Sequence, residues 1–296
     1  MNDSRNRDGS GSEILNFSSI KLINNHTLVA APLGRGLVKR TIHSDWEPMM
    51  EGLPEGTLIN RLHVERDQLF ASTNEGLYMW KNGEWIFNGL VLDCHQFRIR
   101  EGGMLAATSC GLWRLDLDED AYSQDDMLVG QHSSIHGVEG QGHQGNWEMI
   151  IRTSSVLYDF LFLRKYIVMA LGEGLSLYNR YTRRWLDCDF GYAVTSVATS
   201  KNHVLGATDK GELVVVDLEG NCDRFNFDNI FIFAIVPSGD QLYVCTDRGL
   251  YKIVYWGGKI PNLVSVSLGS HVTDIDYDGE NLYMATLFEG VKIIER

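Results

Sequence analysis

The stretch that decides the fold is LYVCTDRGLYKI at residues 242–253. Its apolar and polar residues alternate, a tight turn ends at Gly249, and the alternation then resumes, which predicts two strands joined by a hairpin. Related phrases stand at six other places: LVAAPLGRGLV from residue 28, LFASTNEGLY from 69, MLAATSCGLW from 104, VMALGEGLSL from 168, VLGATDKGELV from 204 and LYMATLFEGVKI from 282. Seven copies predict a repeat protein.

The spacing of the copies indicates the kind of repeat. Successive glycines of the phrase lie 40, 35, 63, 37, 38 and 41 residues apart, at Gly36, Gly76, Gly111, Gly174, Gly211, Gly249 and Gly290. A period near 40 with short strands is typical of propeller blades, and helical periodicity is nearly absent. We therefore predict an all-β, seven-bladed β-propeller with four antiparallel strands, A to D from the centre outward, in each blade. The sixth blade is predicted to have strands at 231–237, 241–246, 249–255 and 262–266.

Two markers place one insertion in the third blade. Predicted outer strands open on tryptophans at Trp46, Trp85, Trp147 and Trp185. Trp147 comes about 26 residues later than the others relative to its glycine, which matches the excess length of the 63-residue spacing. The insertion is predicted at about 118–145, between the third and fourth strands.

The two ends of the chain predict how the ring closes. Only one strand, at 291–295, follows Gly290, whereas a spare strand at 13–17 precedes the first blade. We predict that the N-terminal strand completes the last blade, because closure removes exposed sheet edges. Residues 1–12 are then a disordered tail, and 13–296 form a single propeller domain.

The repeats resemble those of the bacterial two-component-regulator propellers and related seven-bladed families, whose units read roughly L-W/Y-x-A/G-T-x-x-G-L-Y/W. The segments 242–251, 69–78 and 104–113 match best. The signatures of WD40, Asp-box and kelch repeats are missing. The resemblance implies a ring-shaped, WD40-like fold used for binding, and fold alone does not imply function.

Composition narrows the class of partner. A net charge of −13 disfavours nucleic acid and anionic membranes, which need a cationic surface. No apolar run reaches the ~18 residues of a membrane span, and the first twelve residues have no apolar core. The five cysteines form no C-x-x-C pair, which favours reduced thiols. We expect a cytoplasmic, monomeric protein.

The predicted topology gathers side chains on one face. The B–C turns and D–A connections share this face, which we call the first face; the A–B and C–D turns share the second face. The residues that precede the turn glycines include three candidate ligand-binding cations, Arg35, Lys210 and Arg248. A solvated rim is the simpler interpretation of these positions. The candidate catalytic residues on the same face are His95, His271, Glu75, Glu173 and Glu289.

The predicted insertion offers a second candidate site. His132, His136 and His143 lie there with Glu139, and three histidines with a carboxylate can bind zinc. A polar loop without metal is the alternative, because the surrounding glycines disfavour a helix that would align the ligands. A divalent metal is therefore a possible cofactor, and no other cofactor motif is present.

Two classes of function fit these observations. The first is a non-catalytic interaction module that binds a protein or a small polar ligand through the rim or the 118–145 loop. The alternative is a lyase or hydrolase, metal-dependent in some versions, whose site lies at the mouth of the central channel. The missing catalytic motifs favour the first.

Overall fold

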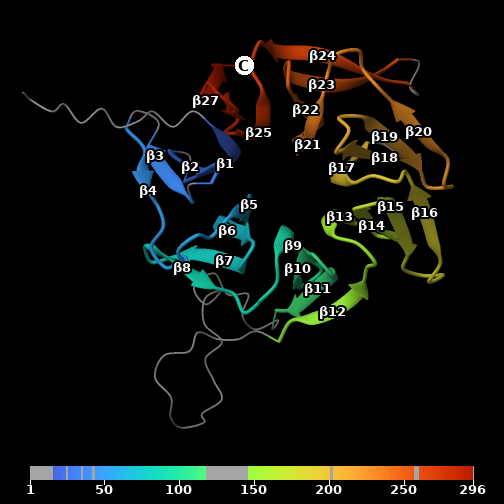
Figure 1. Ribbon diagram of the computed structural model, residues 1–296, viewed down its shortest axis with the longest axis horizontal. Coiled ribbons are helices and arrows are strands. Elements are labelled where there is room, and N and C mark those ends of the chain that lie inside the picture. The colour runs from blue at the N-terminus through green and yellow to red at the C-terminus, as the bar shows by residue number, and fades with distance from the viewer. Residues whose placement is uncertain are drawn as a thin grey trace, which may run out of the picture.

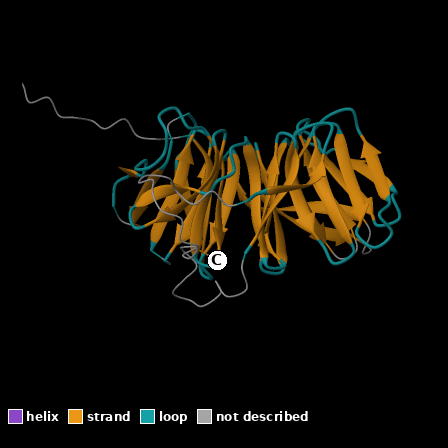
Figure 2. Ribbon diagram, turned by 90° about the horizontal axis from the view of Figure 1, so that it is seen from below, coloured by secondary structure: helices purple, strands orange, loops and turns teal. Residues whose placement is uncertain are grey.

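The computed structural model describes residues 16–24, 26–34, 36–41, 44–117, 146–200, 203–256 and 260–295. Its strands form seven sheets placed around a central channel, which confirms the predicted seven-bladed propeller (Figure 1). The strands run from one face of the disc to the other (Figure 2). No helix in the described part of the chain has the length and apolar character needed to cross a membrane.

Every sheet is antiparallel and follows the order of the chain from the centre outward. The A strands are β1 (Phe17–Ile23), β5 (Ile59–Glu65), β9 (Cys94–Arg100), β13 (Leu157–Phe162), β17 (Val194–Ser200), β21 (Ile232–Ser238) and β25 (Val272–Tyr277). The B strands are β2 (Thr27–Pro32), β6 (Gln68–Thr73), β10 (Gly103–Thr108), β14 (Tyr166–Leu171), β18 (His203–Thr208), β22 (Gln241–Thr246) and β26 (Asn281–Thr286).

The outer half of each blade is shorter or more exposed. The C strands are β3 (Val38–Thr41), β7 (Gly76–Lys81), β11 (Gly111–Asp116), β15 (Gly174–Asn179), β19 (Leu213–Asp217), β23 (Gly249–Trp256) and β27 (Val291–Glu295). The D strands are β4 (Glu47–Pro48), β8 (Glu84–Phe87), β12 (Glu148–Arg152), β16 (Trp185–Asp189), β20 (Cys222–Phe225) and β24 (Ile260–Leu268). The tryptophans that predicted these outer strands lie at or next to their first residues.

The core lies between blades rather than inside one central cluster. Neighbouring sheets cover both faces of each B strand, so β10 is buried along its whole length. The last blade packs on the first through Phe17, Ile20, Tyr283 and Ala285, so face-to-face packing brings the two ends of the ring together. In the described residues the last blade has three strands. Residues 13–15 lie outside the described residues, so the predicted N-terminal closing strand stays a prediction.

The recurring phrase forms the B–C turn as predicted, and the structure adds a reason for its threonine. In four turns the last threonine of the B strand donates a hydrogen bond to the carbonyl of the turn glycine: Thr73 to Gly76, Thr108 to Gly111, Thr246 to Gly249 and Thr286 to Gly290. At Gly249, φ is 146° and an added Cβ would collide with the Ser267 carbonyl of the D strand. Glycine is therefore required by both conformation and space.

Candidate ligand-binding site

Each A strand turns its second residue into the first-face mouth of the channel. The pairing of every A strand with its B strand is shifted at this residue, and such β-bulges re-aim a side chain. One residue from each blade thereby lines a cavity of about 310 Å³: Ser18, Asn60, His95, Tyr158, Thr195, Phe233 and Thr273. We call it the mouth cavity. Arg61, Leu33 and Leu287 also line it.

A second cavity of about 280 Å³ lies further along the channel and is strongly charged. Its ionisable lining residues are Lys21, Arg61, His63, Glu65, Arg98, Asp159, Asp274 and Asp276. Arg61 lines both cavities, so its side chain lies between the mouth and the deeper channel.

Two buried carboxylates in the deeper channel tie blades together. Asp159 accepts hydrogen bonds from Gln96 Nε2 at 2.9 Å and Arg98 Nη2 at 3.0 Å in the third blade, and from the Val197 amide at 2.9 Å in the fifth. These bonds satisfy a charge that would otherwise be costly to bury. Asp159 therefore has a structural role in joining three blades.

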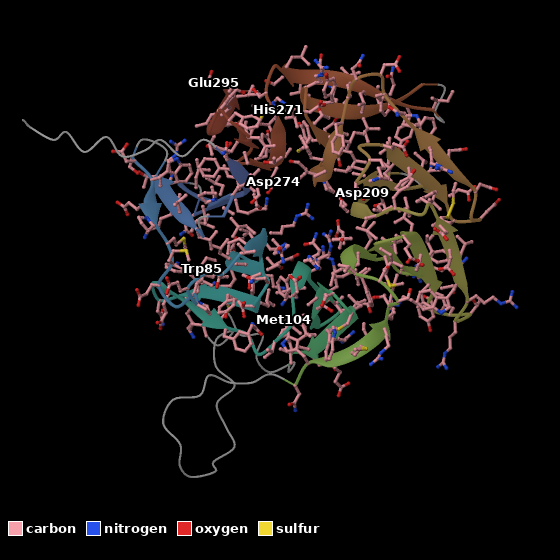
Figure 3. The ribbon with its side chains drawn as sticks, viewed as in Figure 1. Trp85, Met104, Asp209, His271, Asp274 and Glu295 are labelled. Atoms are coloured by element: carbon pink, nitrogen blue, oxygen red, sulfur yellow. A yellow bond between two sulfur atoms is a disulfide. The ribbon has the colours of Figure 1, made fainter. Side chains whose placement is uncertain are left out.

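Asp274 joins the last blade to the first, where the ring closes. Its Oδ2 accepts hydrogen bonds from Ser19 Oγ at 2.8 Å, the Ile20 amide at 3.1 Å and Lys21 Nζ at 2.9 Å, all from the first blade. Figure 3 shows Asp274 on the channel side of the last blade. Burial raises the pKa of its carboxyl, but Lys21, Arg61 and these hydrogen bonds outweigh burial and hold the pKa below its ordinary value.

His95 is the one sequence-predicted catalytic candidate that lines the mouth cavity. Its ring lies 5.2 Å from the Tyr158 ring, and its buried Nε2 has no hydrogen-bond partner. The nearest carboxylate oxygen, Asp93 Oδ2, is 3.6 Å from Nε2. Burial lowers the pKa of His95 against the attraction of Asp93, so the imidazole is neutral at pH 7.

The other candidates do not join His95 around the mouth cavity. Those on B–C turns are exposed, namely Glu75, Glu173, Lys210, Arg248 and Glu289. His271 is also exposed, and its ring meets Phe288 edge-on at 5.4 Å. Arg35 and the histidines His132, His136 and His143 lie outside the described residues. Within the described ranges, no three His, Cys, Asp or Glu side chains are grouped to hold a metal ion.

Most of the mouth cavity was not predicted, because A-strand residues line it, whereas the predicted site residues lie mostly on turns. One lining residue from each blade has the same position in the sequence: it is the second residue of its A strand, counted from the D–A connection. Polar residues occupy six of these seven positions, although inner strands are otherwise mostly buried.

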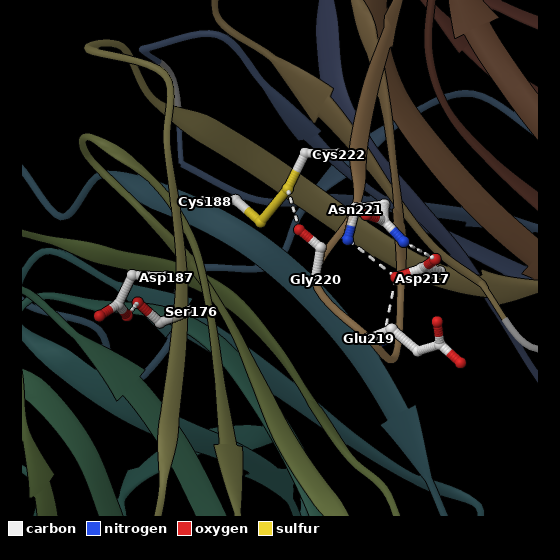
Figure 4. The surroundings of a disulfide bond; sticks show 8 residues. All are labelled: Ser176, Asp187, Cys188, Asp217, Glu219, Gly220, Asn221 and Cys222. Carbon is white, nitrogen blue, oxygen red and sulfur yellow. Dashed lines mark hydrogen bonds between the residues drawn. A yellow bond between two sulfur atoms is a disulfide. The ribbon is translucent and has the colours of Figure 1, made fainter.

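The cysteines correct the expectation of reduced thiols throughout. Cys188 in β16 and Cys222 in β20 form a disulfide between the outer strands of neighbouring blades (Figure 4). They are 34 residues apart, close to the blade period, so a search for short C-x-x-C spacings does not reveal the pair. Disulfides are rare in the cytosol, so the cysteines no longer support the expected cytoplasmic location.

Comparison with known proteins gives the fold. No family model matches the chain, and none of the curated proteins compared matches it. Two extracellular domains from B. thetaiotaomicron are similar: that of BT3049, described as a hybrid two component system (TM-score 0.68, 13% identity, 95% of this chain and 40% of that one), and that of BT4673, described as a one component system (TM-score 0.63, 16%, 96% and 39%). An inactive variant of virginiamycin B lyase from Staphylococcus aureus is also similar (TM-score 0.64, 8%, 97% of both chains).

These identities are low, so the similarity concerns the fold alone. The chain spans about two fifths of the length of the two B. thetaiotaomicron domains. The fold is that of a seven-bladed β-propeller.

Proposed function

We propose that this chain is a non-catalytic interaction module that binds a protein partner on its first face. The observation that carries this proposal is the distribution of exposed apolar side chains. Seven described large hydrophobic residues are more than half exposed, and five of them lie on first-face turns, connections or strand ends: Leu33, Leu58, Val91, Leu268 and Phe288. Apolar side chains that are exposed mainly on one face of a soluble protein can mark an interaction site.

The opposite face has fewer such residues in the described part of the chain. Its exposed large hydrophobics above the same level are Tyr181 and Ile260. The predicted 118–145 loop leaves from the second face, because β11 ends there and β12 begins there. The strand ends that flank the loop therefore lie on the face opposite to the rim, and the exposed apolar side chains favour the first face.

The test compares partner capture by matched variants. Leu58→Glu with Phe288→Glu introduces two charges on the first face, whereas Tyr181→Glu with Ile260→Glu introduces two elsewhere. In pull-downs from the source cells, the proposal expects capture to be lost with the first pair and kept with the second. Loss with the second pair alone would place the interface elsewhere, and circular dichroism checks that both variants are folded.

One observation supports the enzyme alternative. His95 is a neutral imidazole with an unpartnered Nε2 at a cavity, and such a group can act as a general base. None of the predicted partner residues shares its cavity, which is why binding is preferred. His95→Asn in a screen of hydrolase and lyase substrates tests this alternative: an activity that the variant abolishes would support catalysis.

A further inference from the structure

Arg61 shares its counter-ion with another cation of the central channel. Lys21 pairs with Asp274 at 2.9 Å, and Arg98 pairs with Asp159 at 3.0 Å. Glu65 at the far end of the channel pairs with Arg100 at 3.5 Å. The guanidinium of Arg61 has a longer ion pair, 3.7 Å from its Nη1 to Asp159 Oδ2, and shares this carboxylate with Arg98.

The donors of Arg61 are also unused. Its Nη1 lies 3.7 Å from Asp159 Oδ2, beyond hydrogen-bond distance, and no hydrogen bond joins its guanidinium to another described residue. A quarter of the side chain is exposed. A guanidinium presents five N–H donors in a planar fork, so a partly buried one that makes no hydrogen bond is ready to bind an acceptor.

One further carboxylate lines the deeper cavity. Asp276 accepts a hydrogen bond from the Leu22 amide at 2.6 Å, and burial raises the pKa of its carboxyl in spite of the nearby Lys21. Asp276 does not line the mouth cavity, where Arg61 is the one formally charged lining residue.

The remainder of the mouth cavity combines apolar surface with a few polar groups. Phe233, Leu33 and Leu287 supply apolar walls, and the adjacent rings of His95 and Tyr158 supply an aromatic one. The volume of about 310 Å³ is at the lower end for small-molecule sites. A single cation with apolar walls suits a monoanion that carries a hydrophobic group, whereas a phosphate dianion would be left partly unneutralised.

We propose that the mouth cavity binds the carboxylate of a small amphipathic ligand, with Arg61 as the anchoring cation. The planar guanidinium matches a carboxylate in a bidentate arrangement. This inference rests on the proposed binding role of the first face and adds the ligand chemistry. Two sources supply such a group, namely a free aromatic or aliphatic acid and the C-terminal carboxylate of a peptide.

The experiment uses probes that differ in one group. The free acid 3-phenylpropionate is compared with its primary amide, and the peptide Gly-Gly-Phe is compared with its C-terminally amidated form. Ligand-observed NMR titration gives the dissociation constants. Both carboxylates are expected to bind about tenfold or more tightly than their amides, because hydrogen bonds to charged groups contribute about 1.5–3 kcal/mol and 1.4 kcal/mol is tenfold. The tighter of the two carboxylates identifies the source.

Substitutions test whether the carboxylate binds to Arg61 in the mouth cavity. Arg61→Met removes the cation but keeps an extended side chain, and it is expected to abolish the preference for acid over amide. Arg152→Met is the matched control, because Arg152 is an exposed cation that ends the outer strand β12 on the same face. If Arg61→Met does not fold, Thr195→Trp fills the mouth cavity while keeping Arg61, and binding should again be lost.

Three results would overturn the inference: equal binding of acid and amide, unchanged binding by both mouth variants, or no binding of any probe at millimolar concentration. None of these results affects the pull-down test of the first-face rim. Failure of the carboxylate site and failure of the interaction module are therefore distinguishable.

Discussion

Replacement of Asp274 by alanine is expected to destabilise the whole ring, because this carboxylate joins the last blade to the first. Three of its hydrogen bonds go to donors of the first blade, Ser19 Oγ, the Ile20 amide and Lys21 Nζ. The fourth comes from the Ile275 amide in its own strand at 2.9 Å. Alanine leaves all four donors without this acceptor.

The magnitude follows from what the substitution leaves buried. The side chain of Lys21 is 18% exposed and that of Asp274 is 7% exposed, so the pair is largely shielded from water. Removing one partner of a buried ion pair costs about 3–5 kcal/mol, and we expect about 4 kcal/mol here. This is a large share of the ~5–15 kcal/mol that stabilises a typical domain.

The assay is urea unfolding, monitored by tryptophan fluorescence and circular dichroism. Asp276→Asn is the control in the same strand, because burial destabilises the charged form of Asp276 and raises the pKa of its carboxyl. The Asp274 variant should lose several-fold more unfolding free energy than the control. Equal losses, or a loss below about 0.5 kcal/mol for Asp274→Ala, the usual range for surface substitutions, would refute the role of Asp274 in closing the ring.

The remaining predictions concern pH, the disulfide and the repeated turn. The pKa of the Asp274 carboxyl is lowered in the folded protein. Asp274 therefore stabilises the fold above its unfolded pKa of about 3.9, and this stabilisation is lost as the pH falls through the folded pKa. Asp274→Asn should flatten the curve of unfolding free energy against pH in this acid range. Replacing Cys188 and Cys222 by serine should lower the free energy of unfolding by about 4 kcal/mol in denaturant titrations, from the entropy of closing a loop of this length; an unchanged value would argue against the bond. Thr246→Val should cost about 1–3 kcal/mol, because it leaves the turn amides and the Gly249 carbonyl without their hydroxyl partner, and Thr246→Ser should restore most of this in the same titrations.

The fold could be predicted because each blade carries its own local signal. The hairpin around Gly249 is specified by a dozen consecutive residues, and the predicted strand at 241–246 agrees with the observed β22. The predicted outer strand at 262–266 was too short, since β24 covers Ile260–Leu268. Strand ends depend on pairing with β23 rather than on local alternation, which is why they are harder to predict.

The site could be predicted only in part, because it depends on long-range geometry. His95 was placed on the correct face from blade topology alone. The bond between Asp274 and the Ile20 amide joins residues 254 positions apart, and nothing local marks either partner. The role of Arg61 is equally hard to predict, because its counter-ion Asp159 and the other residues that line the mouth cavity are distant in the sequence.

Site-specific photo-crosslinking in the source cells tests the central claim, that the first face binds the partner, most directly. A benzophenone amino acid at Phe288 reports on the first face, and the same group at Tyr181 reports on the second face. The account predicts a discrete crosslinked partner from position 288 and none from position 181. A crosslink from position 181 with none from position 288 would contradict it.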